Sequence, residues 1–177
     1  ETECIVVIDE AYIDFTNKKS WLARLDEFPN LIVCQTLSKA WGMAGIRLGI
    51  CYASEYIIGV LNKVKPPYNI NQLTQDRALE VLGNEELFSK NLHVILSEKE
   101  MLEQAMLDLP IVNRIIPSDA NFFLAEFDDS KYVFDALMAK EIIVRDRSKE
   151  LHCAGCLRIT VGTPEENKKL IEALKEL

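Results

Sequence analysis

Short apolar runs rich in β-branched residues alternate with helical patterns along this chain of 177 residues. Continuous apolar runs of this kind are typical of strands buried on both faces, as in a parallel sheet covered by helices. Between the first two runs, residues 20–28 place apolar side chains on one face of a short helix that ends near Pro29. The predicted strands lie at residues 4–8, 31–34 and 48–52. This alternation of strand, helix and strand predicts an α/β fold.

The second half of the chain continues the alternation after a long helical region. We expect helices at residues 55–64, 71–82, 85–107 and 131–139, and strands at residues 112–116, 122–126, 142–145 and 157–161. A last helix begins after Thr163, where an N-cap threonine, a proline and a capping glutamate form a start signal. The long helix predicts the domain boundary. Residues 1–95 would be part of a large α/β domain with a mostly parallel sheet, and residues 96–177 a smaller α+β domain.

Composition and charge disfavour several classes of protein. The 49% hydrophobic and 27% charged residues are ordinary for a globular chain, and no apolar run reaches the ~20 residues of a membrane span. A net charge of -8 disfavours binding to nucleic acid, because affinity for a phosphate backbone depends on clustered Lys and Arg. Five cysteines, an odd number, indicate reduced thiols, and the acidic N-terminus lacks the features of a secretory signal. We therefore expect a cytoplasmic protein with no membrane or nucleic-acid partner.

The densest group of reactive residues lies at residues 36–49, directly after a predicted strand. Lys39 is flanked by hydroxyl residues, and glycines and Arg47 follow it. Lysine forms a reversible imine with an aldehyde, hydroxyls and arginine hold a phosphate, and glycine lets the backbone approach a ligand closely. Taken alone, Lys39 is typical of an exposed polar loop. The full set instead predicts a site for an anionic cofactor with a reactive aldehyde.

A second group, Asp-Glu-Ala-Tyr at residues 9–12, ends the first predicted strand. Asp9 lies where side chains of an α/β sheet face a ligand crevice. A carboxylate opposite a pyridine nitrogen keeps the ring protonated, so that the ring accepts electrons from a substrate carbanion. Tyr12 is placed to hydrogen-bond the phenolate oxygen of such a ring. Taken alone, these residues fit a turn or a helix cap, but beside Lys39 they predict the ring-binding side of one site.

These motifs together resemble those of the fold-type I aminotransferases, enzymes that use pyridoxal 5'-phosphate (PLP). The motifs are Asp9-x-x-Tyr12, Thr36-x-Ser38-Lys39 and Ala44-Gly45-x-Arg47-x-Gly49. Within that group the chain is similar to the histidinol-phosphate aminotransferases, through residues 66–69, 117–122 and 156–163. The resemblance covers the chain throughout.

The resemblance implies a role for each of these residues. Lys39 would be the catalytic residue, which binds PLP covalently and moves a proton between substrate and cofactor. Asp9 would hold the pyridine nitrogen, and Tyr12 the ring oxygen. The cofactor phosphate would be held by Thr36, Ser38 and Arg47.

Arg145 and Arg158 resemble arginines that such enzymes present to the anionic ends of substrates, and two guanidinium groups suit a phosphate or a carboxylate. Surface ion pairing is the alternative for both in an acidic chain. Asn121 follows a turn and either touches substrate or caps a strand. The implied enzyme is a homodimer that transfers an amino group between histidinol phosphate and 2-oxoglutarate, with glutamate as the partner of the latter, in histidine biosynthesis.

Two other functions fit the same cofactor residues: a PLP-dependent lyase similar to phosphothreonine decarboxylase, and a non-catalytic PLP-binding module. The chain opens directly on a core strand, whereas the family has a phosphate loop, a stacking aromatic residue and an asparagine upstream of that strand. We therefore expect these 177 residues alone to match the latter half of the family, to bind PLP weakly and to turn over negligibly. The Cys-x-x-Cys at residues 153–156 has no second pair at metal-site spacing, so we expect no metal site.

Overall fold

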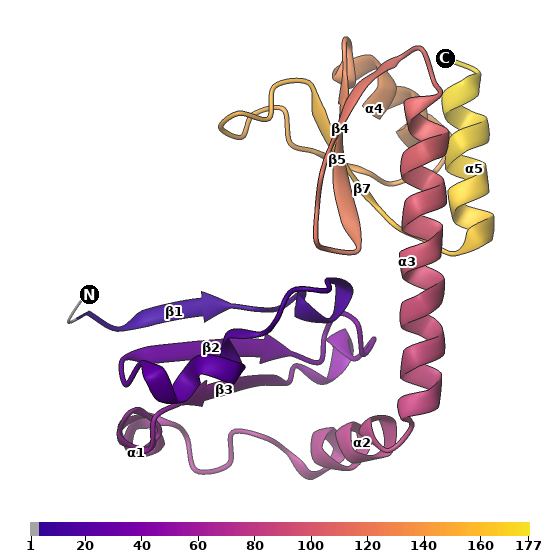
Figure 1. The fold of residues 1–177 in the computed structure, drawn as a ribbon. Helices are drawn as coiled ribbons and strands as arrows, with labels where there is room; N and C mark the ends of the chain where they lie inside the picture. Colours follow the sequence, from indigo (N-terminus) through magenta and orange to yellow (C-terminus); the bar gives the residue numbers. More distant parts are fainter. Residues whose placement is uncertain (1–3) are drawn as a thin grey trace. The chain divides into compact units, whose positions relative to one another are not determined.

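The computed structural model describes residues 4–177, which fold as two compact units (Figure 1). The first unit ends at Lys90, and the second begins at Asn91. The change from one unit to the other falls inside the long helix α3 (Glu85–Leu107). The division between residues 95 and 96 that the sequence suggests stays a prediction about the domains of the whole protein.

The first unit is built around a three-stranded sheet with the order β1-β2-β3 (Figure 1). Its strands are β1 (Val6–Asp9), β2 (Leu31–Thr36) and β3 (Gly49–Ala53). The other elements are the helices α1 (Glu55–Val64) and α2 (Gln72–Leu82) and the 3-10 helices η1 (Ile13–Phe15), η2 (Trp21–Glu27) and η3 (Ala44–Ile46). β1 and β2 run parallel, whereas β2 and β3 run antiparallel. The segments that follow β1 and β2 therefore start from the same edge of the sheet, where ligands of α/β folds bind.

The strands of this sheet are less buried than their apolar sequences predict. In β2, Leu31 and Val33 are 3% and 0% exposed. In β1, by contrast, Val6 and Val7, which point to opposite faces of the sheet, are 38% and 59% exposed, so the described chain buries neither face of this strand. β3 has no buried residue either. The prediction of buried strands is therefore correct for β2 and wrong for β1 and β3.

The short helix predicted at residues 20–28 is of the 3-10 type in the structure. Ser20 begins it, and the Ser20 side chain accepts a hydrogen bond from Leu22 N at 3.0 Å. None of the residues of η2 is buried. Because tertiary packing of an apolar face supplies most of the stability of a helix, this segment has little to favour a longer α-helix.

The second unit has a four-stranded antiparallel sheet with the order β4-β5-β7-β6. Its strands are β4 (Val112–Ile116), β5 (Phe122–Phe127), β6 (Arg145–Asp146) and β7 (Cys156–Thr160). Helices α4 (Ser130–Ala139) and α5 (Pro164–Lys175) and the later part of α3 share one buried core with this sheet. Phe123, Phe127 and Ile159 point into that core and are at most 2% exposed. Because side chains alternate along a strand, Leu124 and Arg158 lie on the opposite face.

Two local sequence signals of the second unit have different outcomes. The predicted strand at residues 142–145 is wrong in its bounds, since β6 comprises only Arg145–Asp146. Val144 is buried and Ile142 packs against the core, so this apolar run reflects core packing rather than strand pairing. The predicted start of the last helix is confirmed, because Thr163 caps α5 and exchanges hydrogen bonds with Glu166.

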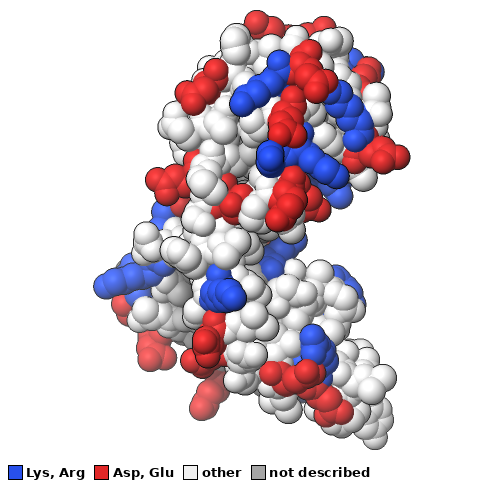
Figure 2. All heavy atoms as spheres, turned by 90° about the vertical axis from the view of Figure 1, so that its right-hand side faces the viewer, with Lys and Arg blue, Asp and Glu red and all other residues white. Residues whose placement is uncertain are grey.

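Acidic and basic side chains are interspersed on the face drawn in Figure 2. Ion pairs form along helices of the described chain, such as Arg77–Glu80 on α2 and Lys168–Glu172 on α5. Exposed pairs of this kind contribute at most about 1 kcal/mol each, so they do not decide the fold. Across residues 4–177, none of the helices combines the length and the apolar character that crossing a bilayer requires.

Candidate active site

Lys39 lies in the loop that joins β2 to β3. At the start of this loop, Gly42 N donates to Lys39 O at 2.9 Å and Met43 N donates to Leu37 O at 2.9 Å. Gly42 has a φ of 67°, a left-handed conformation that glycine adopts without steric cost. The turn fixes the backbone around Lys39 while its side chain stays exposed.

The apolar side of this loop packs against helices of the first unit. Leu37, Met43 and Ala78 of α2 form a buried cluster. Beside it, the Trp41 ring stacks on the Phe88 ring of α3, with centroids 3.9 Å apart and planes inclined by 15°. Lys39 is thus presented by a loop with a packed base, the support that a precisely placed reactive group requires.

Replacing Trp41 by alanine is expected to destabilise the full-length protein by about 2 kcal/mol, because both the burial of the ring and its stacking on Phe88 are lost. Trp41→Phe should retain most of the stability, since it keeps a ring that can stack. Urea unfolding of the wild type and both variants measures the difference. Equal losses in the two variants would show that stacking does not hold this loop.

The hydroxyl groups of Thr36 and Ser38 meet at the carboxyl end of β2. Thr36 Oγ1 lies 2.9 Å from Ser38 Oγ and 3.3 Å from Leu48 O, and it accepts a hydrogen bond from Ser38 N at 3.1 Å. Arg47 follows η3, and its Nη1 donates to Ala44 O at 3.0 Å. The structure therefore brings the two hydroxyls together and directs one guanidinium donor back to the η3 backbone.

Arg47 has a φ of 57° and a ψ of 45°, which lie in the left-handed region. For a residue with a Cβ atom, this conformation costs of order 1–2 kcal/mol. Such strain persists only where the surrounding structure imposes it, and it is concentrated at functional sites. The strained turn sets the direction in which the Arg47 side chain leaves the backbone, directly before β3 begins at Gly49.

Asp9 and Tyr12 lie at the end of β1, beside the strand that leads to Lys39. Asp9 is the register partner of Cys34 on β2, and Asp9 Oδ1 accepts a hydrogen bond from Ala11 N at 2.9 Å. Lys39 Nζ lies 5.2 Å from the centroid of the Tyr12 ring. The structure thus brings Tyr12 and Lys39 together and ends the adjacent strand with a carboxylate.

Glu10 is a residue of this region to which the sequence motifs assigned no role. Glu10 is 7% exposed, and its carboxylate accepts hydrogen bonds from Ser20 Oγ and Trp21 N at 2.7 Å and from Gln35 Nε2 at 3.0 Å. Burial alone raises the pKa of the Glu10 carboxyl, but these hydrogen bonds outweigh burial and hold the pKa below its usual value. Glu10 thus ties the end of β1 to β2 and η2. The sequence signal for this role was a charged residue directly after an apolar run, because a glutamate that is buried there needs hydrogen-bond or charge partners.

The Glu10 carboxylate is expected to stabilise the fold at neutral pH and to lose this contribution in acid. Its folded-state pKa lies below the unfolded-state value of about 4.3. The contribution is therefore complete above the unfolded-state value and disappears as the pH falls through the folded-state value. Glu10→Gln places an amide donor among three donors and should cost about 1–3 kcal/mol at neutral pH. In urea unfolding, the wild type should lose more stability than this variant on acidification; identical losses would contradict the assignment.

The second unit carries Arg145 and Arg158 on the sheet face opposite its core. They are direct register partners across β6 and β7, so their side chains point to the same face. The Arg158 guanidinium carbon lies 4.9 Å from the centroid of the Phe122 ring. Directly opposed like charges destabilise a sheet, whereas an anion bound between them would remove that cost. Asn121 precedes β5, and its carbonyl accepts a hydrogen bond from Val161 N at 2.9 Å.

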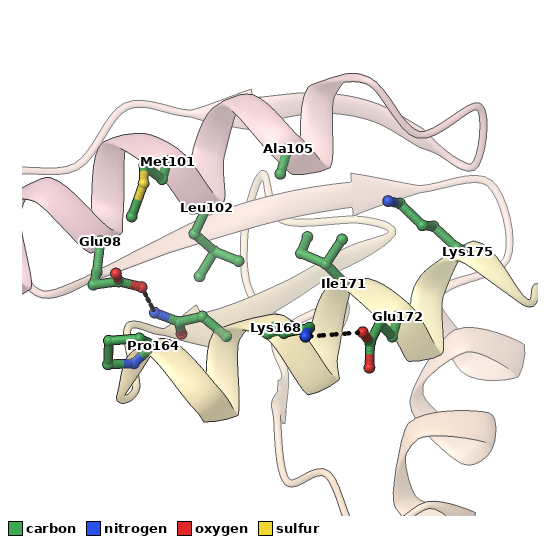
Figure 3. Close-up of a pocket in the computed structure, with 10 residues that line it drawn as sticks. Glu98, Met101, Leu102, Ala105, Pro164, Lys168, Ile171, Glu172 and Lys175 are labelled. Carbon is green, nitrogen blue, oxygen red and sulfur yellow. Dashed lines mark hydrogen bonds and ion pairs between the residues drawn. The ribbon is translucent and has the colours of Figure 1, made fainter.

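A groove of about 410 Å³ lies between α3 and α5 of the second unit (Figure 3). Met101, Leu102 and Ile171 supply apolar lining, as Figure 3 shows. Asn167 Nδ2 donates to Glu98 Oε2 at 2.8 Å and so links the two helices. None of the site residues predicted from the sequence lines this groove, and we assign it to helix packing.

Comparison with known proteins gives sequence relatives for nearly the whole chain. The family model for aminotransferase class I and II matches residues 1–174. The histidinol-phosphate aminotransferase of Christiangramia forsetii is 53% identical over 173 residues, and that of Parabacteroides distasonis is 53% identical over 175 residues. These matches cover 98% and 99% of this chain but 49% and 51% of the relatives. The chain thus spans about half the length of the curated relatives it matches.

Solved structures share the fold at lower identity. The histidinol-phosphate aminotransferase from Clostridium acetobutylicum matches with a TM-score of 0.88 and 23% identity, over 96% of this chain and 53% of that chain. The Sinorhizobium meliloti histidinol-phosphate aminotransferase, solved with PLP, has a TM-score of 0.83 and 24% identity, over 96% and 47%. The L-threonine-O-3-phosphate decarboxylase from Porphyromonas gingivalis has a TM-score of 0.83 and 23% identity, over 96% and 54%. Identities this low establish the fold alone, and the predicted α/β fold of the PLP-dependent transferases is confirmed.

Proposed function

This chain belongs to the class I and II aminotransferases, and from that premise we propose that the whole protein transfers an amino group between histidinol phosphate and 2-oxoglutarate in histidine biosynthesis, with PLP as cofactor. The observation that carries the proposal is the 53% identity to histidinol-phosphate aminotransferases over nearly the whole chain. The reaction is proposed for the full-length protein, since the chain spans about half of these relatives.

The described residues of the first unit fit PLP. Lys39 offers an exposed amine 5.2 Å from the centroid of the Tyr12 ring, and Asp9 ends the adjacent strand. The hydroxyl oxygens of Thr36 and Ser38 lie 2.9 Å apart. An amine, a phenol, a carboxylate and hydroxyls are the groups that suit the aldehyde, ring oxygen, ring nitrogen and phosphate of PLP. When bound, PLP supplies an electron sink for the bond that breaks in the substrate.

Each residue near Lys39 has one task in this proposal. Lys39 Nζ holds the cofactor and afterwards moves a proton to and from the substrate. Asp9 keeps a proton on the ring nitrogen, and Tyr12 donates to the ring oxygen. Arg47 has five N–H donors, so the bond from its Nη1 to Ala44 leaves donors for the phosphate. Thr36 and Ser38 supply the hydroxyl donors.

The second unit contributes the substrate-binding residues in this proposal. Arg145 and Arg158 present two guanidinium groups on one sheet face, which suits the phosphate of histidinol phosphate. The same pair suits a carboxylate of 2-oxoglutarate or glutamate, so that one set of donors serves both half-reactions. Asn121, at the start of β5, is assigned to the substrate side.

A phosphothreonine decarboxylase-like lyase is the second candidate, because one such decarboxylase has the same fold. That likeness rests on 23% identity, whereas the transaminase relatives reach 53%. A non-catalytic PLP-binding module is the third candidate, and it would use the same cofactor residues without turnover. The sequence relatives favour the transaminase over both.

An assay of the full-length protein separates these candidates. Glutamate-dependent conversion of imidazole-acetol phosphate to histidinol phosphate is expected, and carbon dioxide release from phosphothreonine is not. Decarboxylation without transamination would support the lyase. PLP binding with neither activity would support the non-catalytic module. Light scattering of the same sample tests the homodimer that we propose for the full-length protein, and fractionation of cells tests the proposed cytoplasmic location.

A further inference from the structure

Cys34 and Cys51 face each other across β2 and β3. In an antiparallel pair, hydrogen-bonded and non-hydrogen-bonded positions alternate. Leu37 N donates to Leu48 O at 3.3 Å, which marks that pair as hydrogen-bonded. Counting back along the register through Thr36–Gly49 places Cys34–Cys51 at a non-hydrogen-bonded position.

Non-hydrogen-bonded positions bring two side chains close together. Their Cα atoms are separated by about 4.5 Å, which lies within the range of about 4.4–6.8 Å that a disulfide spans. Both thiols are free, and Cys51 is the more exposed of the two. Burial raises the pKa of the Cys34 thiol. The neighbouring Cys51 raises this pKa further through its charge and a side-chain hydrogen bond, and the charge of Asp9 adds to the effect. Because Cys34 and Cys51 are direct register partners, their side chains lie next to each other on the same face of the sheet.

The pair lies at the base of the loop that carries Lys39. Thr36 and Gly49 lie at the two ends of that loop, and they are the last register pair of β2 and β3. A covalent link between Cys34 and Cys51 would enclose residues 35–50, including the whole loop. Asp9 of β1 pairs with Cys34 in the same row of the sheet.

We propose that Cys34 and Cys51 are a redox-active pair that forms a reversible cross-strand disulfide by exchange with a low-molecular-weight disulfide. Cys51 loses its proton, and its sulfur attacks one sulfur of the reagent, whose S–S bond breaks and releases one thiol. Cys34 then loses its proton and attacks Cys51 Sγ, which breaks the mixed disulfide and releases a second thiol. The two cysteines lose two electrons, and the reagent is reduced to two thiols. This site goes beyond the proposed transamination and does not depend on it.

Oxidised glutathione added to the full-length protein tests the proposal. Unreduced peptide mapping of the wild type should join the peptides that contain Cys34 and Cys51, and the joined species should be two hydrogen atoms lighter than the two reduced peptides together. Cys34→Ser should stop at the mixed disulfide on Cys51 and keep a glutathione adduct. Cys153→Ser, a control outside this pair, should behave as the wild type does, and dithiothreitol should restore both thiols.

Three results would overturn the proposal. The first is a wild type that keeps the glutathione adduct on Cys51, because the second exchange step then fails. The second is a link confined to Cys153 and Cys156. The third is a wild type in which Cys34 and Cys51 both stay open to alkylation after exposure to the reagent. Each readout is a mass, so none depends on PLP binding or turnover.

Discussion

The Lys39→Ala variant of the full-length protein is expected to lose covalent PLP binding and at least about a thousandfold of its transaminase activity, because one amine both holds the cofactor and moves the proton. The structure supports this by geometry. The Lys39 side chain is exposed on a loop with a packed base, and its Nζ lies 5.2 Å from the Tyr12 ring centroid. Borohydride reduction followed by peptide mass mapping should place the cofactor on Lys39 in the wild type and nowhere in the variant.

Two further variants distinguish the chemistry of Lys39 from its charge. Lys39→Arg keeps a cation at this position but cannot bond to the aldehyde, so it should bind PLP reversibly and remain inactive. Lys63→Ala removes an exposed lysine in the last turn of α1 and should match the wild type. Unchanged activity in Lys39→Ala, or covalent PLP on another lysine, would remove the basis for this site.

The neighbourhood of Lys39 was accessible to sequence analysis because it follows from topology. β1 and β2 were predicted as strands, and ligand-binding residues of such sheets follow the carboxyl ends of the strands. Asp9, Tyr12 and Lys39 occupy those positions, and the structure places Tyr12 beside Lys39. Local signals of this kind require only that each strand be found and that its end be correct within a residue or two.

The supports of the site could not be predicted, because their partners lie far apart in the chain. Glu10 is held by Ser20, Trp21 and Gln35, which come from η2 and β2. No spacing rule links these residues. The stacking of Trp41 on Phe88 could not be predicted either, because this contact depends on where α3 begins.

The errors in strand bounds and burial have a common physical cause. An apolar run indicates that a segment tends to be buried, but it does not indicate which other segment it packs against. Val144 is buried just before the short strand β6 without belonging to it, whereas Val7 belongs to β1 and stays 59% exposed. Pairing and burial are both decided by neighbours, so the sequence pattern predicts them less well than it predicts strands themselves.

Replacing Arg158 by alanine in the full-length protein is expected to raise KM for histidinol phosphate by about 10- to 100-fold, the effect of losing charge-assisted hydrogen bonds to an anion. The absorbance of bound PLP should change little, because Arg158 belongs to the second unit and is not among the residues assigned to the cofactor. Arg158 is half-buried, whereas its partner Arg145 is exposed. Solvent screening therefore predicts a smaller effect for Arg145→Ala.

Arg147→Ala is the matched control for this prediction. Arg147 lies directly after β6, and its Nη1 lies 3.1 Å from Glu150 Oε1 in a surface ion pair. Its loss should leave KM unchanged. If all three arginine variants raised KM equally, the effect would reflect the net charge of the surface rather than a built anion site. If Arg158→Ala instead displaced PLP with KM unchanged, the side chain would serve the cofactor. A large KM effect at Arg158, a smaller one at Arg145 and none at Arg147 is the combination expected if the opposed pair on β6 and β7 binds the substrate anion.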